Sequence, residues 1–304
     1  MTAGTPTGTV CPACASAVTA TFFTEAAVPT NSCLLLDTPD EADGFPRGSI
    51  DLRFCDTCGF VFNGAFVPGQ PEYSQRYEET QGFSAHFMAF AQDLARRWVE
   101  RYGLADKTAI EIGCGKGEFL LELKKAGAGH CIGIDPGVHP ERIDDPVAAD
   151  IDWVIDFYGP EYGHLDVDAV ICRHTLEHIP DVAAFMTNIR AAIGDRPDTT
   201  VLFELPAIER ILDEVAFWDV YYEHCSYFSL GSLARLFRAT GFEVLDLATE
   251  YDDQYLVIEA RPSTVPAAGA PLPAEDDLDR LRRGVEHFTT GYDALVSRWR
   301  RRLD

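Results

Sequence analysis

Apolar residues recur at intervals of three and four along two stretches of this 304-residue chain. The first stretch begins at Phe87 and continues through Phe90, Ala91, Leu94, Ala95, Trp98, Val99 and Tyr102. This spacing predicts an amphipathic helix that ends near Gly103, because a glycine after the last apolar position commonly stops a helix. Residues 11–66 show no sustained helical period and are rich in Cys, Pro, Gly and Phe, so we expect short strands and turns there.

Short apolar runs alternate with helical patterns in the middle of the chain. Runs typical of buried strands span residues 108–112, 130–134, 168–172, 200–205, 242–247 and 254–260. Helical patterns occupy residues 116–126, 181–193 behind Asp181, and 229–240 behind Ser229, and both of these residue types cap helices. The alternation predicts an α/β fold with a mostly parallel, doubly wound, Rossmann-like sheet and helices on both faces.

The second helical stretch follows a Pro-rich linker and steps through Leu278, Leu281, Val285, Phe288, Tyr292, Leu295 and Trp299. We predict a C-terminal helix that either packs on its own domain or forms a seam for a homodimer or a partner chain. The predicted organisation has four parts: a small Cys-rich module at 1–70, an α/β domain at 71–261, the linker at 262–277 and the helix at 278–304.

The chain is strongly acidic, with 49 Asp and Glu against 25 Lys and Arg and a net charge of −24. Such a surface repels polyphosphate, so we do not expect a nucleic-acid partner, although four arginines gather at 298–302. No apolar run approaches the roughly 18–20 residues of a membrane span. Residues 1–10 are polar and lack the features of a secretory signal. We therefore expect a cytoplasmic protein with no membrane partner.

Four of the nine cysteines form two C-x-x-C pairs, Cys11 with Cys14 and Cys55 with Cys58. Cytosolic thiols stay reduced, so paired cysteines at this spacing point to metal rather than to a disulfide. Four thiolates close the coordination sphere of one tetrahedral zinc, which would then be structural. The alternative is a redox C-x-x-C. The other cysteines are interpreted as small buried apolar residues: Cys33, Cys114, Cys131, Cys172 and Cys225.

A glycine-rich turn follows the first predicted strand of the α/β domain. Glycines let backbone N–H groups approach a ligand at the positive end of a helix. A dinucleotide fingerprint would have glycine or alanine where this turn has Glu118. The acidic surroundings suit the ammonium and sulfonium of S-adenosylmethionine (SAM) better than a pyrophosphate. The candidate SAM-binding residues of this turn are Glu111, Gly113, Cys114, Gly115 and Gly117.

Two aspartates follow this turn at positions suited to the nucleoside of SAM. Asp135 ends the second predicted strand, 22 residues after Gly113, where a carboxylate can accept hydrogen bonds from both ribose hydroxyls. Asp150 is the weaker candidate for the adenine end. The turn, its strand context and Asp135 together favour SAM over a dinucleotide.

Two histidine motifs follow later strands of the same sheet, at the edge where such sheets bind ligands. The first contains Arg173 and His174, which we place beside the cofactor, and His178. The second contains Tyr222, Glu223 and His224 among aromatic residues that exclude water. Methyl transfer to oxygen or nitrogen mainly requires positioning, whereas transfer to carbon also requires a base and a stabilised enolate. A His–Glu–Tyr group fits the second requirement.

These motifs together resemble the sugar C-methyltransferase family, which acts on nucleotide-linked 4-keto-deoxysugars. The resemblance covers residues 11–260. It rests on the four paired cysteines, the 111–117 turn, Leu-Glu-His-Ile at 176–179 and Glu-His-x-x-Tyr-Phe at 223–228, with Tyr77, Gln81, Ser84 and His86 ahead of the domain.

The resemblance implies that His224 removes the proton next to the ketone. It implies that Glu223, Tyr222, His178 and Tyr77 orient the sugar or polarise its oxygens. It also implies a role in specialised metabolism such as antibiotic biosynthesis. Members of the family usually continue into a third, α/β domain that helps hold the nucleotide sugar, whereas this sequence stops at Asp304. Either the substrate is not a nucleotide sugar, or a separate chain or dimer mate supplies that surface.

Three other functions remain open at the level of sequence. The chain is alternatively an O- or N-methyltransferase for a small secondary metabolite, built on the same scaffold. A zinc-ribbon RNA methyltransferase is disfavoured by the acidic charge. A non-catalytic partner of a split enzyme is the third possibility.

Overall fold

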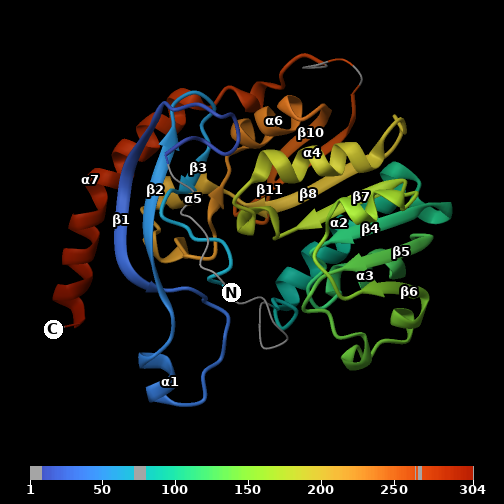
Figure 1. Cartoon of the computed structure of the whole chain (residues 1–304), viewed down its shortest axis with the longest axis horizontal. Coiled ribbons are helices and arrows are strands. Elements are labelled where there is room, and N and C mark those ends of the chain that lie inside the picture. Colours follow the sequence, from blue (N-terminus) through green and yellow to red (C-terminus); the bar gives the residue numbers. More distant parts are fainter. Residues whose placement is uncertain (1–8, 72–79, 264, 266–268, 304) are drawn as a thin grey trace.

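Two β-sheets that lie side by side organise the chain (Figure 1). The computed structural model describes residues 9–71, 80–263, 265 and 269–303. One sheet has four strands and belongs mainly to the N-terminal region, and the other has seven strands in the order β10-β11-β8-β7-β4-β5-β6. No helix within the described residues is long and apolar enough to cross a bilayer.

The seven-stranded sheet confirms the predicted α/β architecture. Five strands run parallel: β4 (Thr108–Ile112), β5 (His130–Ile134), β6 (Ile151–Val154), β7 (Ala169–Arg173) and β8 (Thr200–Pro206). β10 (Phe242–Glu250) and β11 (Tyr255–Pro262) form an antiparallel hairpin beside β8. The sequence pattern did not reveal β6, because it has only four residues and one of them is Asp152.

Helices cover both faces of this sheet, as a doubly wound fold requires. α2 (Ala85–Tyr102) and α3 (Glu118–Lys125) pack on one face, and α4 (Val182–Ile193) and α6 (Leu230–Ala239) pack on the other. Their ends follow the capping residues expected from the sequence. Asp181 accepts a hydrogen bond from the Ala184 N–H, Ser229 caps α6, and Gly103 ends α2 at a φ of 58°.

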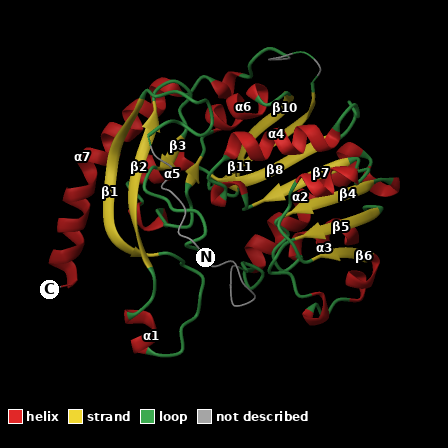
Figure 2. Ribbon diagram, viewed as in Figure 1, coloured by secondary structure: helices red, strands yellow, loops and turns green. Residues whose placement is uncertain are grey.

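The N-terminal sheet contains longer strands than the sequence pattern predicted (Figure 2). β1 (Thr19–Pro29) pairs with β2 (Arg47–Cys55), and β2 pairs with β3 (Val61–Asn63). A loop that carries the short helix α1 (Pro39–Asp43) joins β1 to β2. The fourth strand, β9 (Ser226–Tyr227), comes from the α/β part of the chain and pairs with β3. The N-terminal module and the α/β domain therefore share a sheet.

The C-terminal helix α7 (Leu278–Leu303) packs along β1 and α5 (Ile208–Glu214) of its own chain (Figure 1). Phe288 is fully buried, and its ring meets Phe22 and Phe23 edge-on with centroids 5.8 and 5.4 Å away. Burying one such ring contributes roughly 1.5–3 kcal/mol. The predicted apolar seam thus faces the chain's own core from Leu281 to Leu295, whereas Trp299 is exposed.

The end of the predicted linker is held against helix α6 by buried polar contacts. Asp277 is buried and accepts hydrogen bonds from Ser229 and from the Gly231 N–H at the start of α6, the latter at 2.8 Å. Glu275 is likewise buried and pairs with Arg238 of α6 at 2.7 Å. These contacts fix the point at which α7 begins.

Candidate active site

Two adjoining cavities open at the carboxyl edge of the seven-stranded sheet, where β4 lies between β5 and β7. Ligands bind doubly wound sheets at this point, where the strand order reverses. The smaller cavity has a volume of about 270 Å³ and the larger one about 460 Å³. Gly113, Gly115, His174 and His178 line both. The shared residues belong to the predicted cofactor turn and the first histidine motif, and His224 of the second motif lines the larger cavity alone.

The turn between β4 and α3 has the conformation that its glycines allow. Gly113, Gly115 and Gly117 have φ values of 70°, 52° and 78°, in the region that favours glycine. Gly113 also lies so close to Thr175 that an added Cβ would collide with its side chain. The N–H groups of Gly113 and Cys114 donate to the carbonyl oxygen of Ile134, and the N–H of Gly115 donates to Asp135, so the turn is fixed against the end of β5.

Asp135 ends β5 and borders the smaller cavity, in the position predicted for a ribose contact. Its two carboxylate oxygens accept hydrogen bonds from the backbone N–H groups of Gly115, at 3.0 Å, and Gly137, at 2.6 Å. Burial raises the pKa of Asp135. Each oxygen keeps a second lone pair, so the carboxylate is held in place with acceptor capacity for a diol.

The structure places Asp150 away from this edge. Asp150 is exposed at the amino end of β6 and lines neither cavity. At the carboxyl end of β6, Asp156 and Phe157 line the smaller cavity, which makes them better placed for the adenine end. The sequence pattern lacked β6, so it could not tell which end of that strand faces the ligand.

Glu111, on β4, offers a buried carboxylate to the larger cavity. Its side chain is 2% exposed, and its Oε2 has no hydrogen-bond partner in the described structure. Burial raises the pKa of Glu111 to about 8. An unpaired buried carboxyl suits an arriving ammonium group, so Glu111 fits the predicted contact with the amino-acid end of SAM.

We expect SAM binding to release most of a proton at pH 7. With a pKa of about 8, the Glu111 carboxyl is mainly protonated before binding, and a nearby ammonium favours the ionised form. Calorimetry in buffers of different ionisation enthalpy measures this release. It should fade well above pH 8 and disappear in Glu111→Gln. Equal proton release by the native protein and Glu111→Gln would contradict the assignment.

Arg173 and His174 flank a buried carboxylate on β8. Glu204 pairs with Arg173 at 2.6 Å and with His174 at 3.0 Å. Burial alone would raise the pKa of Glu204, but Arg173 and His174 outweigh it and lower this pKa to about 2. Burial also disfavours charge on His174, yet Glu204 and Glu177 raise its pKa to about 9. His174 lines both cavities, at a φ of 47° that is uncommon for a histidine.

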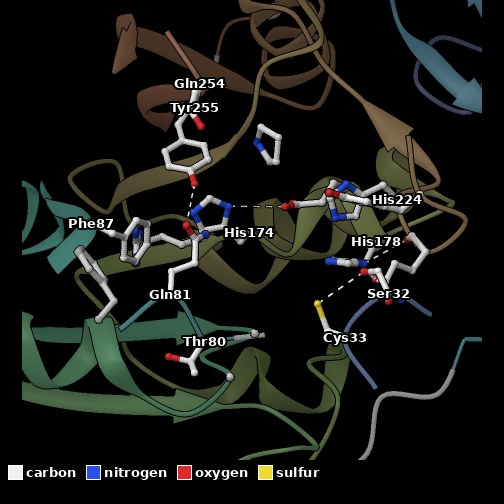
Figure 3. Close-up of a pocket in the computed structure, with 18 of the residues that line it drawn as sticks. Ser32, Cys33, Thr80, Gln81, Phe87, His174, His178, His224, Gln254 and Tyr255 are labelled. Atoms are coloured by element: carbon white, nitrogen blue, oxygen red, sulfur yellow. Dashed lines mark hydrogen bonds and ion pairs between the residues drawn. The ribbon is translucent and has the colours of Figure 1, made fainter. Parts of the chain in front are cut away.

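His178 and His224 lie together on the wall of the larger cavity (Figure 3). Their ring centroids are 4.8 Å apart, and the ring of Tyr221 is 4.9 Å from that of His224. His178 donates through Nδ1 to the carbonyl oxygen of Glu223 at 3.1 Å, which joins the two motifs. Burial, and then the proximity of His178, lower the pKa of His224 to about 3. His224 is therefore a neutral imidazole at ordinary pH.

The carboxylate of Glu223 is held by the N-terminal region. Glu223 is 1% exposed and accepts hydrogen bonds from the Ser32 N–H at 3.0 Å, from the Ser32 hydroxyl and from the Asn31 amide at 3.2 Å. Ser32 and the adjacent Cys33 line the larger cavity beside the two histidines (Figure 3). The loop between β1 and β2 thus forms part of the site, which no local motif indicated.

The structure turns Tyr222 away from the cavity. Its hydroxyl accepts from the Val67 N–H at 3.0 Å and contacts Gln70, while its ring packs on Phe66. Tyr221 lines the larger cavity instead. Tyr77, the other predicted tyrosine, lies outside the described residues.

The four paired cysteines form a compact cluster at one end of the N-terminal sheet. Their sulfur atoms all lie within 4.8 Å of one another, and Cys11–Cys58 and Cys14–Cys55 are each 3.6 Å apart. A tetrahedral zinc with bonds of about 2.3 Å separates its sulfur ligands by about 3.8 Å. The spacing therefore fits a four-cysteine metal site. The structure assembles it across 41 and 47 residues of sequence.

Comparison with known proteins places the chain in a family. Residues 85–247 match the methyltransferase domain family, and this match covers more than half of the chain. The C-methyltransferase NovU of Streptomyces niveus is 26% identical over 260 residues, which cover 83% of this chain and 60% of NovU. The ubiquinone biosynthesis O-methyltransferase of Pseudomonas paraeruginosa is 34% identical over 94 residues, which cover 29% of this chain and 40% of that enzyme.

Among solved structures, the dimethyltransferase RosA of Streptomyces davawensis has a TM-score of 0.46 and 21% identity, over 58% of this chain and 56% of RosA. The chain belongs to the methyltransferase domain family. It spans about 60% of the length of NovU.

Proposed function

We propose that this chain is a C-methyltransferase for a small activated substrate, a nucleotide-linked keto-deoxysugar of specialised metabolism. The observation that carries the proposal is the position of His224, on the wall of a cavity that adjoins the cofactor turn, with the rings of His178 and Tyr221 beside it. Methyl transfer to oxygen or nitrogen has less need of a base held in this way, whereas transfer to carbon depends on one. The similarity to NovU supports the same reaction class.

The residues around the larger cavity suit the formation of an enolate. His224 would take the proton from the carbon next to the ketone, and the electron pair of that C–H bond would remain on the substrate. His178 and Tyr221 border His224 and supply hydrogen-bonding groups near the developing oxyanion. Bound SAM supplies the electrophilic methyl group. The apolar and aromatic walls, including Phe87 and Tyr255, exclude water from the intermediate.

We propose zinc as the occupant of the four-cysteine site, in a structural role. Four cysteines leave no open position for a substrate, and three of them are buried. The site joins the start of the N-terminal sheet to the turn before β3, and β3 pairs with β9, which begins two residues after His224. Zinc would therefore support the strand that positions the base.

Proton exchange tests the proposed base without requiring methyl transfer. The protein is incubated in deuterium oxide with S-adenosylhomocysteine and a panel of nucleotide-linked 4-keto-deoxysugars, and proton NMR follows the carbon next to the ketone. We expect exchange faster than the uncatalysed rate with at least one sugar. If no sugar exchanges but methylation of one occurs, a base at this carbon is excluded.

Arg210 of α5 is the residue we propose for the anionic carrier of the substrate. It lines the larger cavity and lies 3.6 Å from Glu214, which is a weak pairing. We expect Arg210→Gln to raise KM for the nucleotide-linked sugar about tenfold with kcat nearly unchanged, because a charged hydrogen bond contributes about 1.5–3 kcal/mol. Arg280→Gln, on an exposed arginine of α7 outside the cavity, is the control. An unchanged KM would exclude Arg210 from substrate binding.

A second candidate, O-methylation of a small metabolite, is favoured by one observation. The sequence identity to the ubiquinone biosynthesis O-methyltransferase is higher than the identity to NovU, 34% against 26%, although it extends over 94 residues rather than 260. A product with the new methyl group on oxygen would decide for this candidate.

A further inference from the structure

Glu177 is a buried carboxylate that lies beside the proposed base but has no role in the proposed reaction described above. It lies in the one-turn helix Leu176–His178 after β7, and its side chain is 3% exposed. Its Oε1 faces Nδ1 of His174 at 3.7 Å. Its Oε2 is buried without a hydrogen-bond partner in the described structure. A carboxylate oxygen buried in this way is costly unless charge or a proton comes to it.

The surroundings of Glu177 show where that charge can arise. One carboxylate oxygen of Glu177 and one ring nitrogen from each of His178 and His224 lie within 4.8 Å of one another. Three imidazoles face the carboxylate: His174 from the end of β7, His178 from the same turn, and His224 from the segment before β9. The charge on Glu204 is already shared by Arg173 and His174. Glu177 is therefore a carboxylate beside His224 that keeps a free acceptor position within the described structure.

We propose that Glu177 is a positioning residue that orients His224 and stabilises the positive charge formed on it during proton abstraction. This inference rests on the proposed function of His224. In the step, the substrate C–H bond breaks and its electron pair becomes the enolate, while an N–H bond forms on His224. The new imidazolium then faces the ionised Glu177. A carboxylate behind a histidine base plays the same part in serine-protease triads.

The substitution Glu177→Gln removes the charge and keeps the shape. We expect kcat to fall about 100-fold or more, within the range that general-base catalysis supplies, with the Kd for SAM nearly unchanged. Glu209→Gln is the matched control, because Glu209 also has a buried unpaired oxygen but does not line either cavity. Glu177→Asp, which keeps the charge, should recover part of the activity.

Two further measurements separate positioning from a purely structural role. In a double-mutant cycle, Glu177→Gln should cause little additional loss in a His224→Ala background, because both act on one step. NMR titration of the His224 imidazole should give a lower pKa in Glu177→Gln than in the native protein, since Glu177 raises this pKa. The titration requires no substrate, so it tests the contact independently of activity.

The outcomes distinguish this inference from the proposed function. If His224→Ala remains active, the proposed base is wrong. If His224→Ala is inactive while Glu177→Gln behaves like Glu209→Gln, the role of Glu177 is wrong. Two histidines and a carboxylate also suit a divalent cation. If activity requires added Mn²⁺ and Glu177→Gln abolishes Mn²⁺ binding, Glu177 is a metal ligand and our inference is overturned.

Discussion

Replacing His224 with alanine is expected to lower kcat by about 10²–10⁴-fold, the range that a positioned general base contributes. The Kd for SAM should remain close to the native value, because the contacts predicted for SAM are made by the 113–117 turn, Glu111 and Asp135 rather than by His224. Steady-state kinetics with a turned-over keto-sugar and calorimetry with SAM measure the two quantities separately. A loss of turnover with intact cofactor binding locates the defect in the chemical step.

The pKa of His224 also predicts how activity depends on pH. With a pKa of about 3, the imidazole of His224 is unprotonated near neutral pH, so one ring nitrogen can accept a proton. We therefore expect no loss of activity from its protonation near pH 6.5, where an ordinary histidine titrates. His130→Ala is the control, because His130 is exposed and pairs with Asp152 away from the cavities. A His224→Ala variant with near-native kcat would contradict the assignment.

Loss of the proposed zinc is expected to have the second large effect. Cys55→Ser, or removal of zinc by a strong chelator, should unfold the N-terminal sheet and abolish activity. Structural zinc contributes about 10–16 kcal/mol in small zinc domains, which exceeds the stability of many whole domains. Metal analysis should find one zinc per native chain, and circular dichroism should follow the loss of the sheet on heating. Cys33→Ser, outside the cluster, should keep its zinc.

The contacts of the four-cysteine site explain why activity should fall with it. Arg235 of α6 donates to the carbonyl oxygen of Cys58 at 2.9 Å and pairs with Asp277 at 2.6 Å, which links the site to the start of α7. On the other side, the Asn63 N–H donates to the carbonyl oxygen of Cys225 at 2.9 Å, next to His224. A folded, active protein without metal would contradict the structural role.

The α/β domain was predictable because its signals are local. The spacing of apolar residues, the capping residues and the glycines that end helices all lie within or next to the element concerned. Asp181, Ser229 and Gly103 therefore marked helix ends that the structure confirms. Helix α5 went unrecognised, because no side chain caps it and it is only seven residues long. The strands β1 and β2 were underestimated, since their hydrophobic alternation is irregular and their pairing contains register shifts.

The residues of the site were predictable only where they directly follow strands of the parallel sheet. Residues that follow parallel strands meet at one edge, which brought Asp135, His174 and His178 together as expected. Contacts between distant segments left no such signal. Asn31 and Ser32 donate hydrogen bonds to Glu223, although they lie 192 and 191 residues away from it in the sequence. The choice between Tyr221 and Tyr222 depended on the local turn of the backbone.

The position of the transferred methyl group tests the proposed carbon methylation most directly. The protein is supplied with SAM carrying a carbon-13-labelled methyl group and with the panel of keto-sugars, and NMR of the product identifies the atom that bears the label. We predict a label bonded to the carbon next to the ketone, and none in a parallel reaction with His224→Ala. A label on oxygen or nitrogen, formed equally well by both proteins, would contradict C-methylation by His224.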